Sequence, residues 1–203
     1  MLHYETIEPG TLSLFKSLLE LPILAETRLV GGTALALQLG RRKSVDLVFF
    51  GKVSATSEEL RTTLIQAGFK LSVVRESRNI NIYDINGIKV DFVNYIYDWI
   101  GNLVTEDGLR LADAKDIAAM KINAIIGRGT RKDFVDLFFL LQHFSLKEML
   151  EMFQEKYPEG SMFLALKSVA YFEDAENSPM PVMLKKVPWS LMKKTILANV
   201  KAL

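Results

Sequence analysis

The stretch from residue 30 to residue 50, VGGTALALQLGRRKSVDLVFF, decides the fold that this sequence predicts. The paired glycine Gly31-Gly32 follows an apolar residue and opens a helix-like run. Basic residues 41–43 come next, and Asp46 lies in a strand-like apolar run. This order suits phosphoryl transfer, which requires a backbone that can approach phosphate, positive charge beside it and a carboxylate that can hold a metal ion.

Composition bounds the class of protein. The chain has 203 residues and is 49% hydrophobic, enough for one sizeable core or for a main domain with a helical appendage. Its net charge of +1 gives no global basic field of the kind that marks many nucleic-acid-binding proteins. The absence of cysteine excludes disulfides and thiolate chemistry and fits a reducing cytoplasm.

Targeting and metal signals are weak. The N-terminal sequence MLHYETIEPG has no apolar signal-peptide core, and no apolar run approaches the roughly 20 residues of a membrane helix. We therefore expect a cytoplasmic protein with no membrane partner. With two histidines and no cysteine, a zinc site is not expected.

The first half of the chain predicts helices and strands in alternation. Pro22 disturbs the end of an amphipathic helix, Gly40 stops the next helix, and Ser57 is the expected N-cap of a third that ends at Gly68. The expected helices are residues 11–25, 32–40 and about 57–68, and the expected strands are 45–50 and 70–76.

Residues 79–95, NINIYDINGIKVDFVNY, predict a β-hairpin. Asn86-Gly87 between two alternating runs is the signal for a type I′ turn. On the second strand, the period of two places Lys89, Asp91 and Val93 on one face, with the apolar residues between them on the other.

The second half predicts helices at residues 112–127, 130–144 with Thr130 as N-cap, 146–171 and 189–202. The expected fold class is α/β: a small mixed sheet flanked by helices, followed by a helical C-terminal half. We place two domains, an α/β domain at 1–110 and a helical domain at 111–203 that completes the cleft.

Two carboxylates lie on predicted strands. Asp46 and Val48 share one strand face, and Asp91 converges with Asp46 if its strand lies alongside. Such a pair can hold Mg²⁺, which neutralises a triphosphate. In the alternative, Asp46 is a surface residue and Asp91 pairs with Lys89. The diglycine bend favours the metal-binding interpretation.

Charged residues also cluster in the helical half. Lys121 and Arg128 are seven residues apart, and Lys132 and Asp136 are four apart, so basic side chains from two consecutive helices could reach one cleft. Lys121 could instead extend to the surface past its apolar neighbours. Asp133 has two open roles, a capping-box acid for the helix or a catalytic group.

These motifs together resemble one family. Val30-Gly31-Gly32 followed by Asp46 is similar to the signature of the DNA-polymerase-β-like nucleotidyltransferases, in which a diglycine or glycine-serine precedes an Asp-x-Asp pair. The fuller pattern over residues 25–145 resembles the AbiEii/AbiGii-type nucleotidyltransferases, the toxin components of bacterial abortive-infection and toxin–antitoxin systems. The segments that carry the resemblance are GGTALAL, RRKSVDL, FF, IKVDFV and AAMKINAIIGRGTRKDFVDLFFLL.

The resemblance implies transfer of a nucleoside monophosphate from an NTP to an acceptor hydroxyl with Mg²⁺, with RNA or tRNA as one candidate acceptor and an antitoxin as a candidate protein partner. It implies that Asp46 and Asp91 bind the metal. The implied catalytic residues are Asp46, Asp91, Lys121 and Asp136. For nucleotide binding, family and position together indicate Gly31, Gly32, Thr33, Arg42, Ser44, Lys121, Arg128 and Lys132.

Val48 departs from the family pattern, because it stands where a second carboxylate completes Asp-x-Asp. Valine cannot coordinate Mg²⁺, and loss of one such preorganised group is expected to slow the reaction by about 10²-fold or more. Three hypotheses follow: a weakened enzyme, an NTP-binding protein that has lost turnover, or a scaffold that binds an antitoxin.

Overall fold

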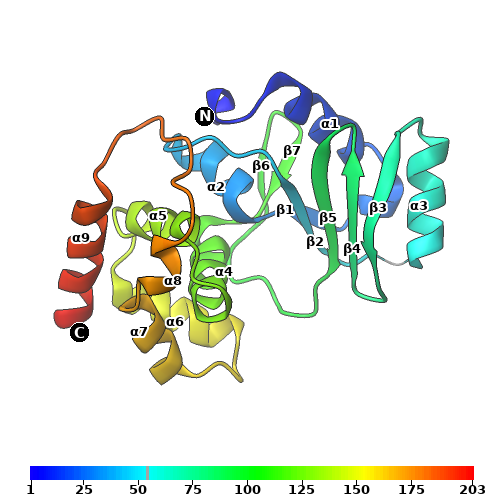
Figure 1. Ribbon diagram of the computed structural model, residues 1–203. Helices are drawn as coiled ribbons and strands as arrows, with labels where there is room; N and C mark the ends of the chain where they lie inside the picture. The colour runs from blue at the N-terminus through cyan, green and yellow to red at the C-terminus, as the bar shows by residue number, and fades with distance from the viewer. Residues whose placement is uncertain (54) are drawn as a thin grey trace.

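A computed structural model describes residues 1–53 and 55–203 and has the expected α/β class (Figure 1). The strands gather in one sheet, and the helices of the second half pack together on the far side of α2. The α-helices are α1 Pro9–Leu19, α2 Gly31–Leu39, α3 Ser57–Gln66, α4 Ala114–Gly127, α5 Arg131–Leu140, α6 Leu146–Lys156, α7 Met162–Val169, α8 Glu173–Glu176 and α9 Trp189–Lys201, and short 3₁₀ turns cover Tyr4–Thr6 and Pro22–Leu24.

The sheet is mixed and has the strand order β3-β4-β5-β2-β1-β7-β6. Its strands are β1 Thr27–Leu29, β2 Leu47–Gly51, β3 Leu71–Glu76, β4 Ile80–Ile85, β5 Ile88–Asn94, β6 Val104–Glu106 and β7 Leu109–Leu111. β2 runs parallel to β5, and β1 runs parallel to β7; the other neighbouring pairs are antiparallel. The parallel β2–β5 pair is the centre of the sheet and brings the two carboxylate-bearing segments together.

Local sequence signals produce two features of the fold as expected. Gly40 ends α2 in the left-handed conformation, at φ +65°, which glycine adopts without a steric penalty. Asn86 and Gly87 both have positive φ, +56° and +80°, as a type I′ turn requires. This turn fixes the β4–β5 register that places Asp91 opposite Ile82.

Other boundaries differ from the prediction. The first helix ends at Leu19, because Pro22 begins a separate 3₁₀ turn. The N-cap of α3 is Thr56 and not Ser57, since the Thr56 hydroxyl and Glu59 form a capping box. The expected helix at 146–171 is two helices, α6 and α7, and Pro158 lies in the break between them.

The two faces of the sheet are covered differently. On one face, Phe49 of β2 stacks on Phe92 of β5 with ring centroids 5.5 Å apart and contacts Phe15 of α1. This face is closed by α1 and α3, which bury Phe15 and Leu18 of α1 and Leu60 and Leu64 of α3 in the core. The opposite face carries the half-buried Val48 and Asp91. It is the face available to a ligand.

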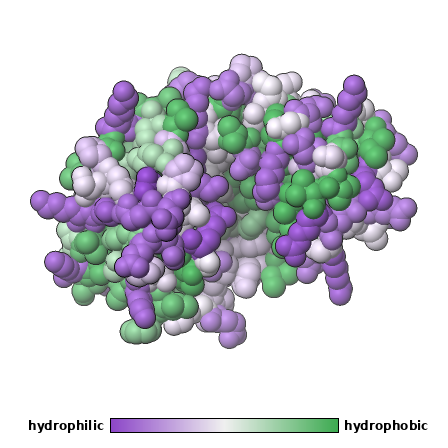
Figure 2. Space-filling model, in the orientation of Figure 1, coloured by the Kyte–Doolittle hydropathy of each residue, from purple (hydrophilic) through white to green (hydrophobic). Residues whose placement is uncertain are grey.

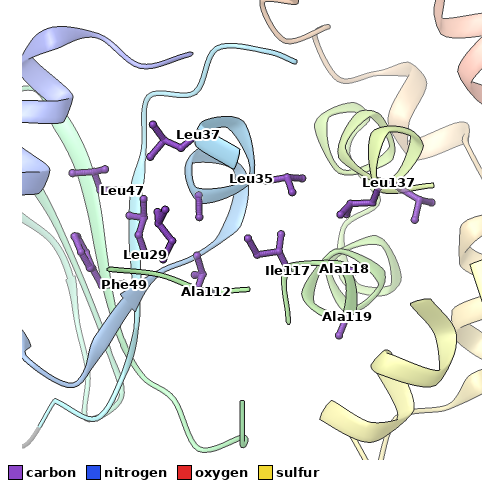
Figure 3. Packing of buried hydrophobic residues seen from close by; sticks show 14 of the residues in the cluster. Leu29, Leu35, Leu37, Leu47, Phe49, Ala112, Ile117, Ala118, Ala119 and Leu137 are labelled. Carbon is purple, nitrogen blue, oxygen red and sulfur yellow. The ribbon is translucent and has the colours of Figure 1, made fainter. Parts of the chain in front are cut away.

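The hydrophobic core runs without a break from the sheet through α2 to the helical half (Figure 3). Leu29 and Leu47 lie on the sheet side, Leu35 projects from α2, and Ala118 and Leu137 continue the packing into α4 and α5. The strands end at Leu111 and the long helices begin at Ala114. The division into domains at 1–110 and 111–203 stays a prediction.

Among the helices of residues 1–53 and 55–203, none combines the length and apolar character needed to cross a bilayer.

Candidate active site

A cavity of about 670 Å³ opens between the free face of the sheet and the helical half. Figure 2 shows this side of the molecule hollowed between the two parts, with hydrophilic side chains on both rims. The walls come from the start of α2, the loop between α2 and β2, strands β2 to β5, helix α4, the start of α5 and a loop near the C-terminus. All eight residues predicted to bind nucleotide line it: Gly31, Gly32, Thr33, Arg42, Ser44, Lys121, Arg128 and Lys132.

The two predicted metal ligands lie in this one cavity. Asp46 immediately precedes β2, and Asp91 lies on β5 directly beside Val48 in the parallel register. The alternation of burial agrees, because Leu47 and Phe49 are buried on the other face. Asp46 and Asp91 therefore face the same side of the sheet.

The two oxygens of Asp91 have different environments. Oδ2 accepts a 2.7 Å hydrogen bond from the Lys89 ammonium. Oδ1 is buried and has no hydrogen-bond partner among the described residues. Because a buried, unsatisfied carboxylate oxygen is costly, this atom fits a cation that it would coordinate. The expected pairing with Lys89 is therefore present, and it leaves Oδ1 open to a further partner.

The diglycine bend opens the N-terminus of α2 toward the cavity, beside the carboxylates. Gly31 has φ +69°, a conformation that side-chain-bearing residues rarely adopt. Val30, the N-cap of α2, supplies no side-chain hydrogen bond to the first turn, so the helix N-terminus faces the cavity without a side-chain cap. The guanidinium of Arg42 lies so close to Gly32 that a Cβ there would collide with it. The positive end of the α2 dipole and the Arg42 guanidinium therefore lie together at Gly32.

Thr33 and Ser44 connect α2 to the segment that carries Asp46. The Thr33 hydroxyl donates a short hydrogen bond to the backbone carbonyl of Asp46 and lies 2.8 Å from the Ser44 hydroxyl. The backbone N–H of Ser44 donates to the carbonyl of Thr6. These contacts fix the position of Asp46 relative to the diglycine bend.

Arg42 is held by Asp136 through two hydrogen bonds, Nε to Oδ1 at 2.7 Å and Nη2 to Oδ2 at 2.9 Å. Both side chains are almost fully buried. Burial alone would lower the pKa of Arg42, but the charge of Asp136 and its hydrogen bonds outweigh burial and raise it. The guanidinium therefore stays charged beside the diglycine bend.

Lys121 lies between two acidic side chains. Its ammonium is 2.6 Å from Oδ2 of Asp136 and 3.1 Å from Oδ1 of Asp133. Asp133 also accepts hydrogen bonds from Arg128 at 2.9 and 3.0 Å and from the Thr130 hydroxyl at 2.6 Å. Lys121 is 4% exposed, so the alternative that it extends to the surface is wrong.

This network also corrects the predicted cap of α5. Thr130 is the N-cap, but its side chain makes no capping bond and instead binds the Asp133 carboxylate. Burial would raise the pKa of Asp133, yet the hydrogen bond from Arg128 and the charges of Lys121 and Arg128 hold it well below its ordinary value. Asp133 is an ionised anchor for both basic side chains.

Asp136 is placed differently from the other predicted catalytic residues. Both of its oxygens are engaged by Arg42 and Lys121, and its side chain is buried behind those two cavity-lining groups. Burial would raise its pKa, but the charges of Lys121 and Arg42 lower it. Asp136 can thus orient two cations without facing the cavity itself.

Several cavity residues escaped the sequence analysis. Ile80 and Ile82 of β4 face the cavity beside Asp91 and Val93, as the two-residue hairpin turn already implies through its register. The position of Arg75 depends on a register shift in β3 that has no clear sequence signal. The remaining wall residues not predicted include Phe50, Met120, Asn123, Tyr157, Pro181 and Val182.

Within the described part of the chain, no three His, Cys, Asp or Glu side chains form a metal-binding group. The donor set at the cavity is two carboxylates, Asp46 and Asp91. Val48 occupies the strand position, beside Asp91, at which a third carboxylate would stand. Carboxylate oxygens suit Mg²⁺, which commonly takes only one or two of them and completes its shell with water and phosphate oxygens. The residues present therefore fit one such ion.

Known proteins resemble this chain in sequence and in fold. The chain is 35% identical over 169 residues to an uncharacterised protein of Aquifex aeolicus, and the match covers 80% of this chain and 81% of that protein. Its fold is similar to JHP933 from Helicobacter pylori, with a TM-score of 0.59, 16% identity and coverage of 97% and 92% of the two chains. It is also similar to MenT4, a nucleotidyltransferase toxin of Mycobacterium tuberculosis, with a TM-score of 0.58, 15% identity and coverage of 95% and 83%.

The sequence profile described as "Nucleotidyl transferase AbiEii toxin, Type IV TA system" matches residues 14–202, nearly the whole chain. This match extends well beyond the segments 25–145 on which the resemblance was first based. The chain belongs to the AbiEii nucleotidyltransferase toxin family.

Proposed function

We propose that this protein transfers a nucleoside monophosphate from an NTP to an acceptor hydroxyl, releasing pyrophosphate. The observation that carries the proposal is the meeting of Asp46, Asp91 and the diglycine bend in one cavity of about 670 Å³. A cavity of this size lies within the range that encloses small-molecule ligands. In such a reaction the protein contributes mainly positioning and charge neutralisation.

The triphosphate would bind at the start of α2. The backbone N–H groups of Gly32 and Thr33 point along the helix axis from its positive end, and Arg42 adds a fixed guanidinium. The partial positive charge of the helix N-terminus and the charge of Arg42 both face the same point. The anion site therefore favours phosphate over a neutral ligand.

Asp46 and Asp91 would hold Mg²⁺, which when bound neutralises phosphate charge and polarises the attacked phosphorus. The free Oδ1 of Asp91 supports this assignment, because it is buried without another partner. Thr33 would keep Asp46 in place through its carbonyl. We also propose that Asp91 assists the deprotonation of the acceptor hydroxyl.

The basic residues of the helical half would form the opposite wall. Lys121, Arg128 and Lys132 all line the cavity, and Lys132 is exposed with no ion pair among the described residues. We propose that these three contact the nucleotide or its phosphates. We propose Asp136 as a positioning residue, since it holds Arg42 and Lys121 and does not face the substrate.

Val48 supports a second candidate function, an NTP-binding protein with little or no turnover. Its side chain lines the cavity beside Asp91 and offers no metal ligand. The rest of the binding apparatus is present, so loss of one carboxylate affects the transfer step more than the binding of the triphosphate. Both candidate functions require NTP binding, and they differ in whether the protein then transfers the nucleotide.

The test is to titrate purified protein with each NTP, with and without Mg²⁺, and to incubate it with labelled NTPs and total RNA. We expect the wild type to bind NTP and to transfer weakly or not at all. Val48→Asp should gain transfer, by about 10²-fold, because it restores the missing carboxylate. The gain should require Asp46 in the same protein.

Two controls make the experiment decisive. Val48→Asn has nearly the same shape as the aspartate but no charge and should not gain transfer. Asp46→Ala should abolish whatever transfer the wild type has. Equal, robust transfer by wild type and Asp46→Ala would overturn the assigned site, and absence of NTP binding in all variants would favour the scaffold hypothesis.

The partners follow from the family and the substrate class. We propose RNA, including tRNA, as an acceptor class, and a cognate antitoxin as the protein partner, because the family's description places its members in toxin–antitoxin systems. We propose a cytoplasmic location, where NTP and RNA are available. Labelled products from the incubation, separated by size, distinguish tRNA from longer RNA and from protein.

A further inference from the structure

Asp91 has apolar neighbours on both sides along the sheet. Val48 of β2 and Ile82 of β4 are its direct cross-strand partners, and both line the cavity. Directly opposed residues on a sheet face lie about 4.5–5.5 Å apart at Cβ, so these two occupy the positions from which a second polar group could reach the carboxylate. The charge of Asp91 must be compensated from elsewhere.

Lys89 supplies that compensation from the same strand. It lies two residues before Asp91, hence on the same face, and its ammonium is 2.7 Å from Oδ2. The Lys89 side chain is 46% exposed, whereas that of Asp91 is 17% exposed. The lysine therefore covers Asp91 from the solvent side, while Oδ1 stays buried and unpaired.

Four other cations at or beside the cavity form ion pairs with other acids. Arg42 and Lys121 are bound to Asp136, Arg128 is bound to Asp133, and Lys43 is bound to Glu8. Lys89 is the cation whose ion pair is made with Asp91 itself. Replacing Lys89 with a neutral residue would change the charge beside Asp91 and would leave the ion pairs of Asp133 and Asp136 intact.

We propose that Lys89 acts as an internal cation that weakens divalent metal binding at Asp91, so that the ion binds tightly only together with the triphosphate. This inference rests on the proposed function. Asp46 and Asp91 contribute a charge of −2, which Lys89 and a divalent ion together exceed by one unit. The negative charge of an NTP's phosphates would outweigh this excess of one positive charge. Because valine stands at position 48 in place of a carboxylate, the site lacks a negative charge that would otherwise balance Lys89.

The test is binding of Mn²⁺, a spectroscopic substitute for Mg²⁺, measured by electron paramagnetic resonance without nucleotide. We expect Lys89→Met to bind Mn²⁺ about tenfold more tightly than wild type, because a +1 charge about 5 Å from a divalent ion repels it by that order even in water. Lys89→Arg keeps the charge and should match wild type. Lys147→Met on the surface of α6 removes a charge elsewhere and should also match it.

Adding a non-hydrolysable NTP analogue should tighten Mn²⁺ binding more in wild type than in Lys89→Met. Lys89→Gln repeats the test with a polar side chain, should the methionine disturb the strand. Unchanged or weaker Mn²⁺ binding in both neutral variants, with weakening in Asp91→Asn, would overturn the inference and leave the proposed site standing. Equal binding in wild type, Asp91→Asn and Asp46→Asn would overturn the metal site and the inference with it.

Discussion

Gly32 is the residue at which the absence of a side chain matters most for the site. Arg42 reaches it from the loop before β2, and the Arg42 guanidinium fills the space that a Cβ would need. The same guanidinium is fixed from behind by Asp136 and has little freedom to move aside. A methyl group at position 32 must therefore displace either Arg42 or the first turn of α2.

Gly32→Ala should weaken NTP binding by about tenfold or more, because a charge-assisted hydrogen bond to phosphate contributes about 1.5–3 kcal/mol. Isothermal titration calorimetry with an NTP measures the change. Gly10→Ala is the matched control, since a Cβ there meets open space and Gly10 has no positive φ. Unchanged affinity in Gly32→Ala would show that Arg42 does not contribute to binding.

At this scale the sequence predicted which residues reach the cavity better than what they do there. Asp46, Asp91 and the diglycine followed from spacing and resemblance. The partners of Asp133 and Asp136 did not, because they depend on how α4 and α5 pack against the loop that carries Arg42. Sequence periodicity predicts which face of a helix is buried, but it does not predict which charged side chains of other elements contact that face.

At the scale of elements, Asp136 joins α5 to α4 and to the loop before β2. Its folded-state pKa is lowered, so it stabilises the fold fully above its ordinary pKa, and this contribution is lost as the pH falls below about 4. Removing one partner from a buried ionic network costs about 3–5 kcal/mol. The network is therefore both a positioning device and a stability element.

Asp136→Asn should lower the free energy of unfolding at pH 7 by about 3–5 kcal/mol, and its difference from wild type should narrow below pH 4. Urea denaturation at several pH values measures both effects. Glu151→Gln, which removes an exposed pair with Lys147 on α6, should have almost no effect. A pH-independent difference would contradict the assigned ionisation.

Elements with strong local signals were the predictable ones. The Asn86-Gly87 turn gave the hairpin, and Gly40 gave the end of α2. The three-residue strands β1, β6 and β7 were missed, because so few residues carry no measurable alternation. β1 is nevertheless central, since it pairs with both β2 and β7.

At the scale of the whole molecule, a separate buried ion pair holds the segment after β5 against the helical half. Lys156 of α6 is 2.6 Å from Asp116 of α4, both side chains are fully buried, and the lysine also donates to the carbonyl of Asp98. Asp116 accepts hydrogen bonds from the backbone N–H groups of Ile100 and Gly101. Sheet and helices meet at this point.

Lys156→Met should destabilise the protein by about 3–5 kcal/mol, because it leaves the carboxylate of Asp116 buried without its cation. The midpoint of thermal unfolding should fall by about 6 °C or more for a chain of this length. Lys194→Met, on the exposed side of α9, is the control and should leave the midpoint unchanged. Equal midpoints for the two variants would mean that Lys156 is dispensable for joining the halves.

The α/β class and the order of strands before helices could be predicted from the pattern of apolar residues. The way the two halves enclose a cavity could not, because it depends on contacts between residues far apart in the chain. The bridge between Arg42 and Met183 is one such contact, and it places Pro181 and Val182 on the cavity wall.

That bridge has a consequence for biosynthesis. The Lys43 N–H donates to the carbonyl of Val182, and the Leu184 N–H donates to the carbonyl of Arg41. Residues 182–184 are therefore hydrogen-bonded to the loop that carries Arg42. A nascent polypeptide has made the diglycine bend and both aspartates long before residue 183 leaves the ribosome. Until then the pocket lacks part of its rim, and a growing chain of this toxin family carries an unfinished site while it is still being translated.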